Sequence, residues 1–162
     1  MTALHRTAPQ GVSARLSRIG AASVLTAAAV AVPPVFPGTA QRADAATLAL
    51  QALGVAASKQ GSPYQWGATG PYRFDCSGLT MYSFKHVGKK LPRTAAAQYN
   101  STRHIGAGSR HLGDLVFFHS GSYVYHVGIY AGNGRIWHAP KTGARVRLEK
   151  IWTRSVWYGR VR

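Results

Sequence analysis

Residues 126–139 read HVGIYAGNGRIWHA, two short apolar runs on either side of Gly132-Asn133-Gly134. Asn-Gly between β-prone segments is a strong hairpin signal. Further strands are expected at 115–118, before the hairpin, and at 144–148 and 156–161, after it. These segments are either continuously apolar or alternate with a period of two. The second half of the chain therefore predicts an antiparallel sheet.

The residues between 46 and the predicted sheet have helical patterns instead. Residues 46–60 place leucines among alanines ahead of Gly61, and residues 75–87 mix apolar and polar positions ahead of Gly88. Thr94 is the expected N-cap of a third, short helix. Between the first two helices, the Gly- and Pro-rich residues 61–74 predict an ordered loop. Helices followed by strands predict an α+β domain, with the N-terminal helices packed on the C-terminal sheet.

Cys76 is the only cysteine in the chain, and it follows Asp75 at the expected start of the second helix. The basic and apolar N-terminal segment described below predicts export, and an unpaired thiol in an exported protein is either a small buried hydrophobe or a nucleophile. Free backbone N–H groups at a helix start favour an anion, so the position predicts a lowered thiol pKa. The same groups can hold the oxyanion that forms when a thiolate attacks a carbonyl. The alternative is that Asp75 only caps a helix whose cysteine faces the core.

A thiolate nucleophile needs an imidazole base and a third group that orients this base. His126 and His138 stand out because both are flanked by strand residues on the predicted hairpin. Metal binding by the pair is disfavoured, since no nearby carboxylate or thiol completes a zinc site. The other mature-chain histidines are expected in solvated or strand-end positions: His86, His104, His111 and His119.

The hairpin register tests this pairing. A regular two-residue turn at Asn133-Gly134 places His138 opposite Ile129, so the two histidines lie on opposite faces of the sheet. A three-residue loop, or a bulge elsewhere in the hairpin, places His138 beside Gly128 and on the face of His126. The hypothesis of cooperating histidines therefore predicts such an irregularity.

The N-terminal segment differs in composition from the rest. Three arginines precede an apolar, uncharged run at residues 19–32, which is shorter than the roughly 20 residues that span a bilayer. The triplet Ala43-Asp44-Ala45 follows. This order is typical of a secretory signal peptide comprising residues 1–45, and it predicts no stable membrane span. Residues 46–162 then form a single domain.

The chain has a formal net charge of +16. After residue 45, Asp75, Asp114 and Glu149 are its only acidic residues. Such charge predicts attraction to polyanions. The polyanions that an exported protein meets first are anionic wall polymers and lipid head groups. Nucleic acid is therefore not expected as a partner. A solvated basic face without a partner is the alternative.

Six motifs in the chain together resemble the NlpC/P60 peptidoglycan endopeptidases, over roughly residues 46–162. Each motif by itself is weak, but six in order are specific. One departure is Ala68, where the family more often has a second glycine after Trp66-Gly67; the added methyl narrows the expected cleft. Another is the lack of the wall-binding or coiled-coil modules that many members carry. The motifs are PYQWG (63–67), FDCSGL (74–79), LPRT (91–94), GDLVFF (113–118), HVGIY (126–130) and HAP (138–140).

The resemblance implies a papain-like core, with Cys76, His126 and His138 as catalytic triad. It implies a secreted, wall-associated monomer that cleaves stem peptides between D-γ-glutamate and a diamino acid and uses no metal or organic cofactor. Substrate-lining residues are implied at Tyr64 and at two residues of the Cys76 motif, Asp75 and Ser77.

Two other readings of the residues stay open. The same triad serves amidases that cut between glycan and peptide, or acyl transfer in place of hydrolysis. The domain can also be a cationic module that binds wall polymer or nucleic acid, with an inert cysteine. Trp152, Trp157 and Tyr158 can stack on bases, although aromatic residues on strands more often form core or cleft walls.

Overall fold

The structure of the protein is a computed structural model that describes residues 37–162. Most of the predicted signal peptide, including the apolar run at 19–32, lies outside these residues. None of the helices within 37–162 is long and apolar enough to cross a membrane. The helices are α1 (Pro37–Ser58), α2 (Cys76–Lys85), α3 (Ala95–Ser101) and the short 3₁₀ helix η1 (Ala107–Ser109).

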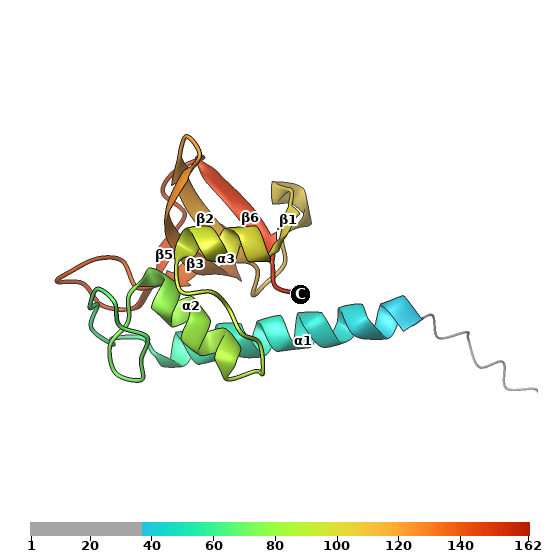
Figure 1. Ribbon diagram of the computed structural model, residues 1–162, viewed down its shortest axis with the longest axis horizontal. Helices are drawn as coiled ribbons and strands as arrows, with labels where there is room; N and C mark the ends of the chain where they lie inside the picture. The colour runs from blue at the N-terminus through green and yellow to red at the C-terminus, as the bar shows by residue number, and fades with distance from the viewer. Residues whose placement is uncertain (1–36) are drawn as a thin grey trace, which may run out of the picture. The chain divides into compact units, whose positions relative to one another are not determined.

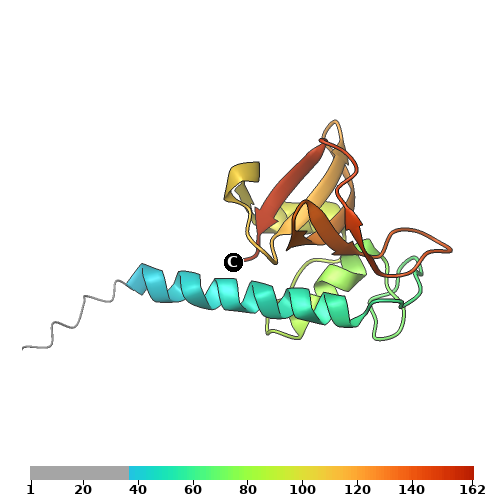
Figure 2. The same cartoon turned by 180° about the vertical axis from the view of Figure 1, so that it is seen from behind.

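Six antiparallel strands form one sheet in the order β1-β6-β2-β3-β4-β5. Helices precede strands along the chain, and Figures 1 and 2 show this arrangement from both sides. The predicted α+β class with an antiparallel sheet is therefore confirmed. The strands are β1 (Arg103–Ile105), β2 (Leu115–Ser120), β3 (Tyr123–Gly132), β4 (Arg135–His138), β5 (Arg147–Lys150) and β6 (Val156–Arg160).

The predicted helix starts are confirmed at two N-caps. The Asp75 side chain accepts from the backbone N–H of Gly78 at α2, and the Thr94 hydroxyl accepts from that of Ala97 at α3. The start of α1 was predicted wrongly, because the helix begins at Pro37 and not at Ala46. Proline suits the first helical position and the following residues are rich in alanine, so nothing local delays the helix.

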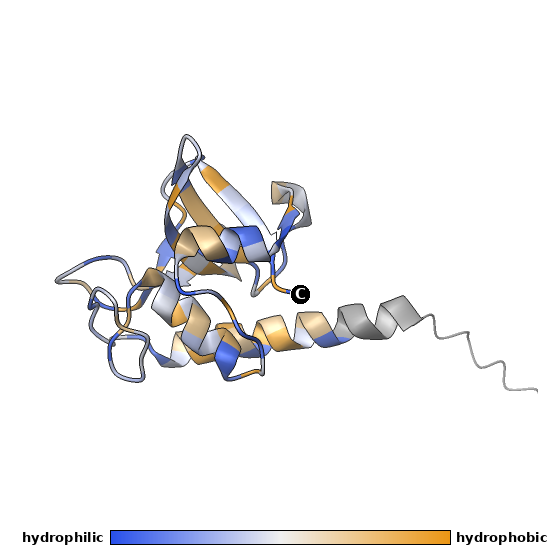
Figure 3. Cartoon of the chain, viewed as in Figure 1, coloured by the Kyte–Doolittle hydropathy of each residue, from blue (hydrophilic) through white to orange (hydrophobic). Residues whose placement is uncertain are grey.

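The two faces of the sheet pack in separate cores. One core lies between the sheet and the helices, where Phe117 and Ile129 meet Leu79 and Phe84. The second gathers on the opposite face around Phe118 and other buried side chains. Figure 3 shows apolar residues along α1 and in the sheet strands. The central strands β2 and β3 are thus largely buried on both sides, which makes the middle of the sheet a rigid support for side chains at its rim. The other buried members of the second core are Val116, Tyr130, Ile136 and Tyr158.

Two parts of the sheet differ from the sequence prediction. The three-residue strand β1 was missed, since His104 and its neighbours read as a polar loop. The fifth strand was expected at 144–148 but occupies Arg147–Lys150. Residues 144–146 pair with the loop after α1 instead: Tyr64 N–H donates to the carbonyl of Ala144, and Val146 N–H donates to that of Ser62. This long-range pairing moves the strand toward the C-terminus and brings Glu149 into the sheet.

Candidate active site

Cys76 is the first residue of α2, and its side chain is partly exposed. The residue therefore packs against the core without being fully enclosed by it. Its position follows from the loop before it, because the Asp75 N–H donates to the Ala68 carbonyl and so fixes the entry of the chain into the helix. A Cβ atom on Gly78 would lie 2.1 Å from that carbonyl oxygen, so only glycine lets the loop pack this closely on the first turn.

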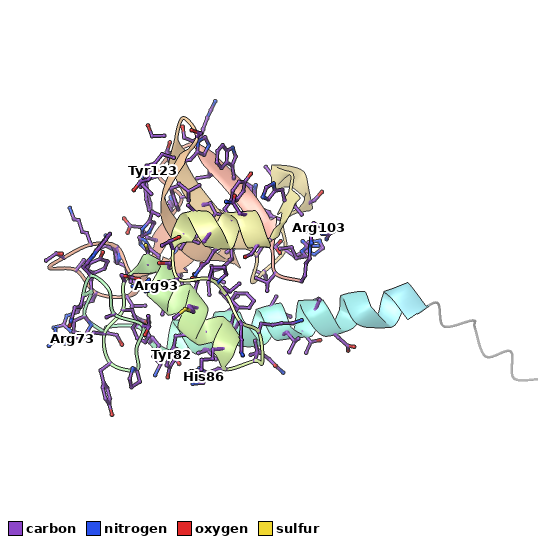
Figure 4. All side chains as sticks on the ribbon, viewed as in Figure 1. Arg73, Tyr82, His86, Arg93, Arg103 and Tyr123 are labelled. Atoms are coloured by element: carbon purple, nitrogen blue, oxygen red, sulfur yellow. The ribbon has the colours of Figure 1, made fainter. Side chains whose placement is uncertain are left out.

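The Asp75 carboxylate is buried and holds the surroundings of Cys76 together. It accepts from Gly67 N–H at 2.9 Å and from Gly78 N–H at 2.7 Å. Arg93, from the connector between α2 and α3, forms an ion pair with it and also donates to the Ser77 hydroxyl at 2.9 Å. Figure 4 shows Arg93 beside the start of α2. Loop, helix and connector are thus tied to one carboxylate.

The pKa of the Cys76 thiol is raised, because the group is desolvated by burial and faces the charge of Asp75. Backbone N–H groups of Ser77 and Val127 act in the opposite direction but do not outweigh these causes. The predicted lowering of this pKa was therefore wrong. The helix start supplies donors, as expected, but the capping carboxylate next to the cysteine opposes a preformed thiolate.

The predicted irregularity in the hairpin is confirmed as a bulge. Asn133 and Gly134, with φ of 50° and 66°, form a two-residue turn in which Gly132 faces Arg135. Farther along, Tyr130 faces Ile136, so Ala131 is an extra residue in β3. This shift places His138 across from Gly128, on the face of His126.

A second bulge in β3 precedes His126. Phe118 faces His126, whereas the next pair is His119 with Val124, so Tyr125 is the extra residue. Bulges bend a strand and change the direction of the side chains beside them. Gly128 contributes as well, since a Cβ atom there would lie 2.7 Å from the Ile136 side chain. The backbone of β3 is therefore shaped on both sides of the position where the two histidines meet.

The two histidines are hydrogen-bonded to each other. His126 Nε2 lies 2.8 Å from His138 Nδ1, and His138 Nε2 lies 2.9 Å from Glu149 Oε2. Trp152 stacks on Phe118 and lies close to both imidazole rings. Burial lowers the pKa of His126 to about 3 and also lowers the pKa of His138. Both rings are therefore neutral at pH 7.

Val127 connects Cys76 to this pair. The backbone N–H of Val127 acts on the Cys76 sulfur, and His126 is its neighbour in the chain. Because Nε2 of His126 is engaged by His138, its other ring nitrogen, Nδ1, is the one free to meet a thiol. Tyr64 also belongs to this neighbourhood, since the charges of Cys76 and Asp75 contribute to raising its pKa after the larger effect of burial.

The sequence-predicted residues do not all have the same exposure. Tyr64 is half-buried, whereas Asp75 and Ser77 are buried and hydrogen-bonded to Arg93. Their role toward a substrate stays a prediction. The remaining histidines within 37–162 lie elsewhere, for example His104 stacked on Tyr99 and His119 stacked on Trp157. In the same part of the chain, no group of three or more His, Cys, Asp or Glu side chains is arranged to hold a metal ion.

One residue of the site was missed from the sequence. Glu149 was placed beyond the expected strand, and its only available signal is that it is the sole glutamate of the chain. Its position depends on how the chain after β4 folds back over the sheet.

Residues 61–161 match the family model described as the NlpC/P60 family. The chain belongs to the NlpC/P60 family. Its matched region contains Cys76, His126 and His138. A Corynebacterium glutamicum protein named "probable endopeptidase" is 47% identical over 100 residues, which cover 62% of this chain and 47% of that protein.

Other proteins that are similar to this chain carry more specific names. The bifunctional muramidase/DL-endopeptidase CwlT of Bacillus subtilis is 46% identical over 88 residues, covering 52% of this chain and 27% of CwlT. The solved structure of the peptidoglycan hydrolase RipB from Mycobacterium tuberculosis superposes with a TM-score of 0.66 at 30% identity, covering 80% of this chain and 74% of that one. The chain therefore spans about half or less of the length of these two curated relatives.

Proposed function

We propose that the protein is a cysteine peptidase that hydrolyses peptidoglycan stem peptides, with Cys76 as nucleophile, His126 as base and His138 as the partner of that base. The observation that carries the proposal is the hydrogen bond between His126 and His138. His126 lies on β3 next to Val127, whose backbone N–H interacts with the sulfur of Cys76 at the start of α2. The relatives named endopeptidase, DL-endopeptidase and peptidoglycan hydrolase support the substrate class.

The protonation states define the first step. With the thiol and His126 both neutral, the S–H proton passes to His126 as sulfur attacks the carbonyl carbon. An S–C bond forms and the carbonyl oxygen becomes an oxyanion, which backbone N–H groups of the first turn of α2 stabilise. The Gly78 N–H is already bonded to Asp75, so the earlier amides of the turn serve this role.

The second half of the reaction returns the enzyme to its starting state. The imidazolium of His126 protonates the leaving amine, and the C–N bond breaks to leave an S-acyl enzyme. His126 then takes a proton from water, and the hydroxide attacks the acyl carbon. The C–S bond breaks, the carboxylic acid product is released, and the His126 imidazolium returns its proton to the Cys76 sulfur. All of these proton transfers use groups of the chain and water.

The proposed bond lies between D-γ-glutamate and the following diamino acid. The name of CwlT, a DL-endopeptidase, supports this choice over the bond between glycan and peptide. Tyr64 is the proposed contact of the stem peptide, as the half-buried residue next to the nucleophile. Asp75 and Ser77 are the proposed supports of this contact on either side of Cys76 in the chain, where they hold Arg93 and the Gly67 loop in place.

Digestion of purified cell walls tests the proposal. Fragments released by the protein are expected to end in D-γ-glutamate on one side and to begin with a free diamino acid on the other, as identified by mass spectrometry of muropeptides. Boiled protein serves as control. Fragments cut between muramic acid and L-alanine would replace the proposed activity by an amidase. Intact muropeptides would count against hydrolysis altogether.

We further propose that the mature chain is exported and held at the wall by its charge. The three acidic residues after residue 45 each pair with an arginine, so the remaining cations are not neutralised within the domain. The fraction bound to purified walls is expected to fall when the salt concentration rises from about 0.1 M to 1 M, because the screening length shortens from about 10 Å to 3 Å. Binding measured by sedimentation that is unchanged at high salt would contradict an electrostatic attachment.

A further inference from the structure

We propose that Glu149 is a positioning residue that sets the tautomers of both histidines, so that His126 presents an unprotonated Nδ1 to Cys76. The inference rests on the proposed function, in which His126 is the base. It extends the three-residue arrangement by a fourth group, which the strand β5 brings to the far side of His138.

The sheet register places Glu149 where it can act on His138. Across the β4–β5 pair, Ile136 faces Glu149 and His138 faces Arg147, so Glu149 and Arg147 flank the same imidazole. Glu149 Oε2 lies 2.9 Å from His138 Nε2. Arg147 donates to the same oxygen through Nε at 2.8 Å and forms an ion pair with it, in which Nη2 lies 2.7 Å from Oε2. The arginine therefore holds the carboxylate in the orientation in which it meets His138.

Glu149 is the last group in this row of hydrogen bonds, and its charge determines the direction of each of them. The hydrogen bond from Arg147 lowers the pKa of Glu149, so the carboxylate is ionised and can only accept. The Nε2 atom of His138 must then carry a proton and donate a hydrogen bond to Glu149. Because burial keeps His138 neutral, its Nδ1 has no proton and accepts from His126 Nε2–H. A neutral His126 with its proton on Nε2 has a bare Nδ1, which is the form that can accept a proton from a thiol.

The opposite arrangement uses the same distances but cannot function. If His138 carries its proton on Nδ1, it donates to His126 Nε2, and the proton of neutral His126 must sit on Nδ1. His126 then presents an N–H to the thiol and cannot act as base. The exposed fractions of His126 and His138 are only 6% and 1%, so bulk water does not choose between the two arrangements. The acceptor at Glu149 makes the choice.

The carboxylate has a second effect once His126 becomes charged. Its charge raises the pKa of His126 and its hydrogen bond raises that of His138, in opposition to the larger effect of burial. It therefore stabilises the imidazolium that forms during attack, when His126 holds the proton of Cys76. Loss of Glu149 is expected to slow the chemical step more than it weakens substrate binding.

Three variants of the full chain test the inference. Glu149→Leu removes the acceptor and puts an apolar side chain in its place. Glu149→Gln removes the charge, but its amide oxygen can still accept from His138 and Arg147. Lys150→Gln, at the exposed neighbouring position on β5, is the matched control for loss of a charge on this edge strand. The variants are compared by ¹⁵N NMR of histidine-labelled protein, which distinguishes protonated Nδ1 from protonated Nε2 without any substrate, and by kcat and KM for wall peptide.

In the wild type and in Lys150→Gln, both histidines are expected as Nε2–H tautomers. Glu149→Leu is expected to populate Nδ1–H forms of both rings and to lower kcat about 10-fold or more with little change in KM, the size usual for an outer partner of a functional histidine. Glu149→Gln is expected to keep the tautomers and to lose less of kcat. Wild-type tautomers in Glu149→Leu overturn the inference, as does an unchanged kcat. A wild type that shows the expected tautomers but no hydrolysis contradicts only the proposed function.

Discussion

Replacement of Cys76 by alanine is expected to lower the rate of wall-peptide hydrolysis at least about 10³-fold, because Cys76 is the only cysteine of the chain and its sulfur forms the proposed acyl intermediate. Cys76 is partly exposed and its side chain is small, so the domain should fold as before. Binding to walls should persist, since it depends on charge spread over the surface. The measurement is kcat on purified muropeptides together with wall binding by sedimentation.

Met81→Leu is the matched control for this variant, because Met81 lies on the same helix and is half-buried outside the site. It should retain activity within a factor of a few. Hydrolysis that survives in Cys76→Ala would show that the cysteine is inert and would favour a binding module. Loss of wall binding together with activity would point to a folding defect, which circular dichroism of the variant detects.

Acidification from pH 7 to pH 4 is expected to lower the free energy of unfolding by about 3 kcal/mol through His126 alone. The pKa of His126 is about 3 in the folded protein and 6.5 when the side chain is free. Between these values the unfolded chain binds more protons than the folded one, so stability is full above pH 6.5 and is lost as the pH falls toward 3. His138 and Glu149, whose pKa values are also lowered, act in the same direction.

Urea unfolding at pH 7, 5.5 and 4 measures this loss. The control is His126→Gln, in which the titrating group is absent. Between pH 7 and pH 4, its free energy of unfolding should fall by about 3 kcal/mol less than that of the wild type. Equal pH dependence in both proteins would mean that His126 is not held neutral by burial. The comparison depends only on folding, and therefore tests the environment of the proposed base independently of any substrate.

Local patterns predicted much of the fold because they report on interactions between near neighbours. Asp75 and Thr94 cap α2 and α3 as expected, since capping involves only the next three residues. Asn133-Gly134 predicted the hairpin turn, since few residues adopt positive φ easily. By contrast, β1 and the shift of β5 depend on partners distant in the chain, such as the pairing of Ala144 with Tyr64, and nothing local indicates them.

For the candidate site, the sequence alone determined the residue types and their order: one thiol at a helix start and two histidines on a hairpin that needed an irregularity to share a face. Tertiary structure decided the position of that irregularity at Ala131, the burial that keeps His126 neutral, and the raised pKa of Cys76. It also decided that Glu149, the only glutamate, meets His138. The physical reason is that periodicity and capping act over a few residues, whereas desolvation and hydrogen bonds between strands depend on which distant segments exclude water from the same place.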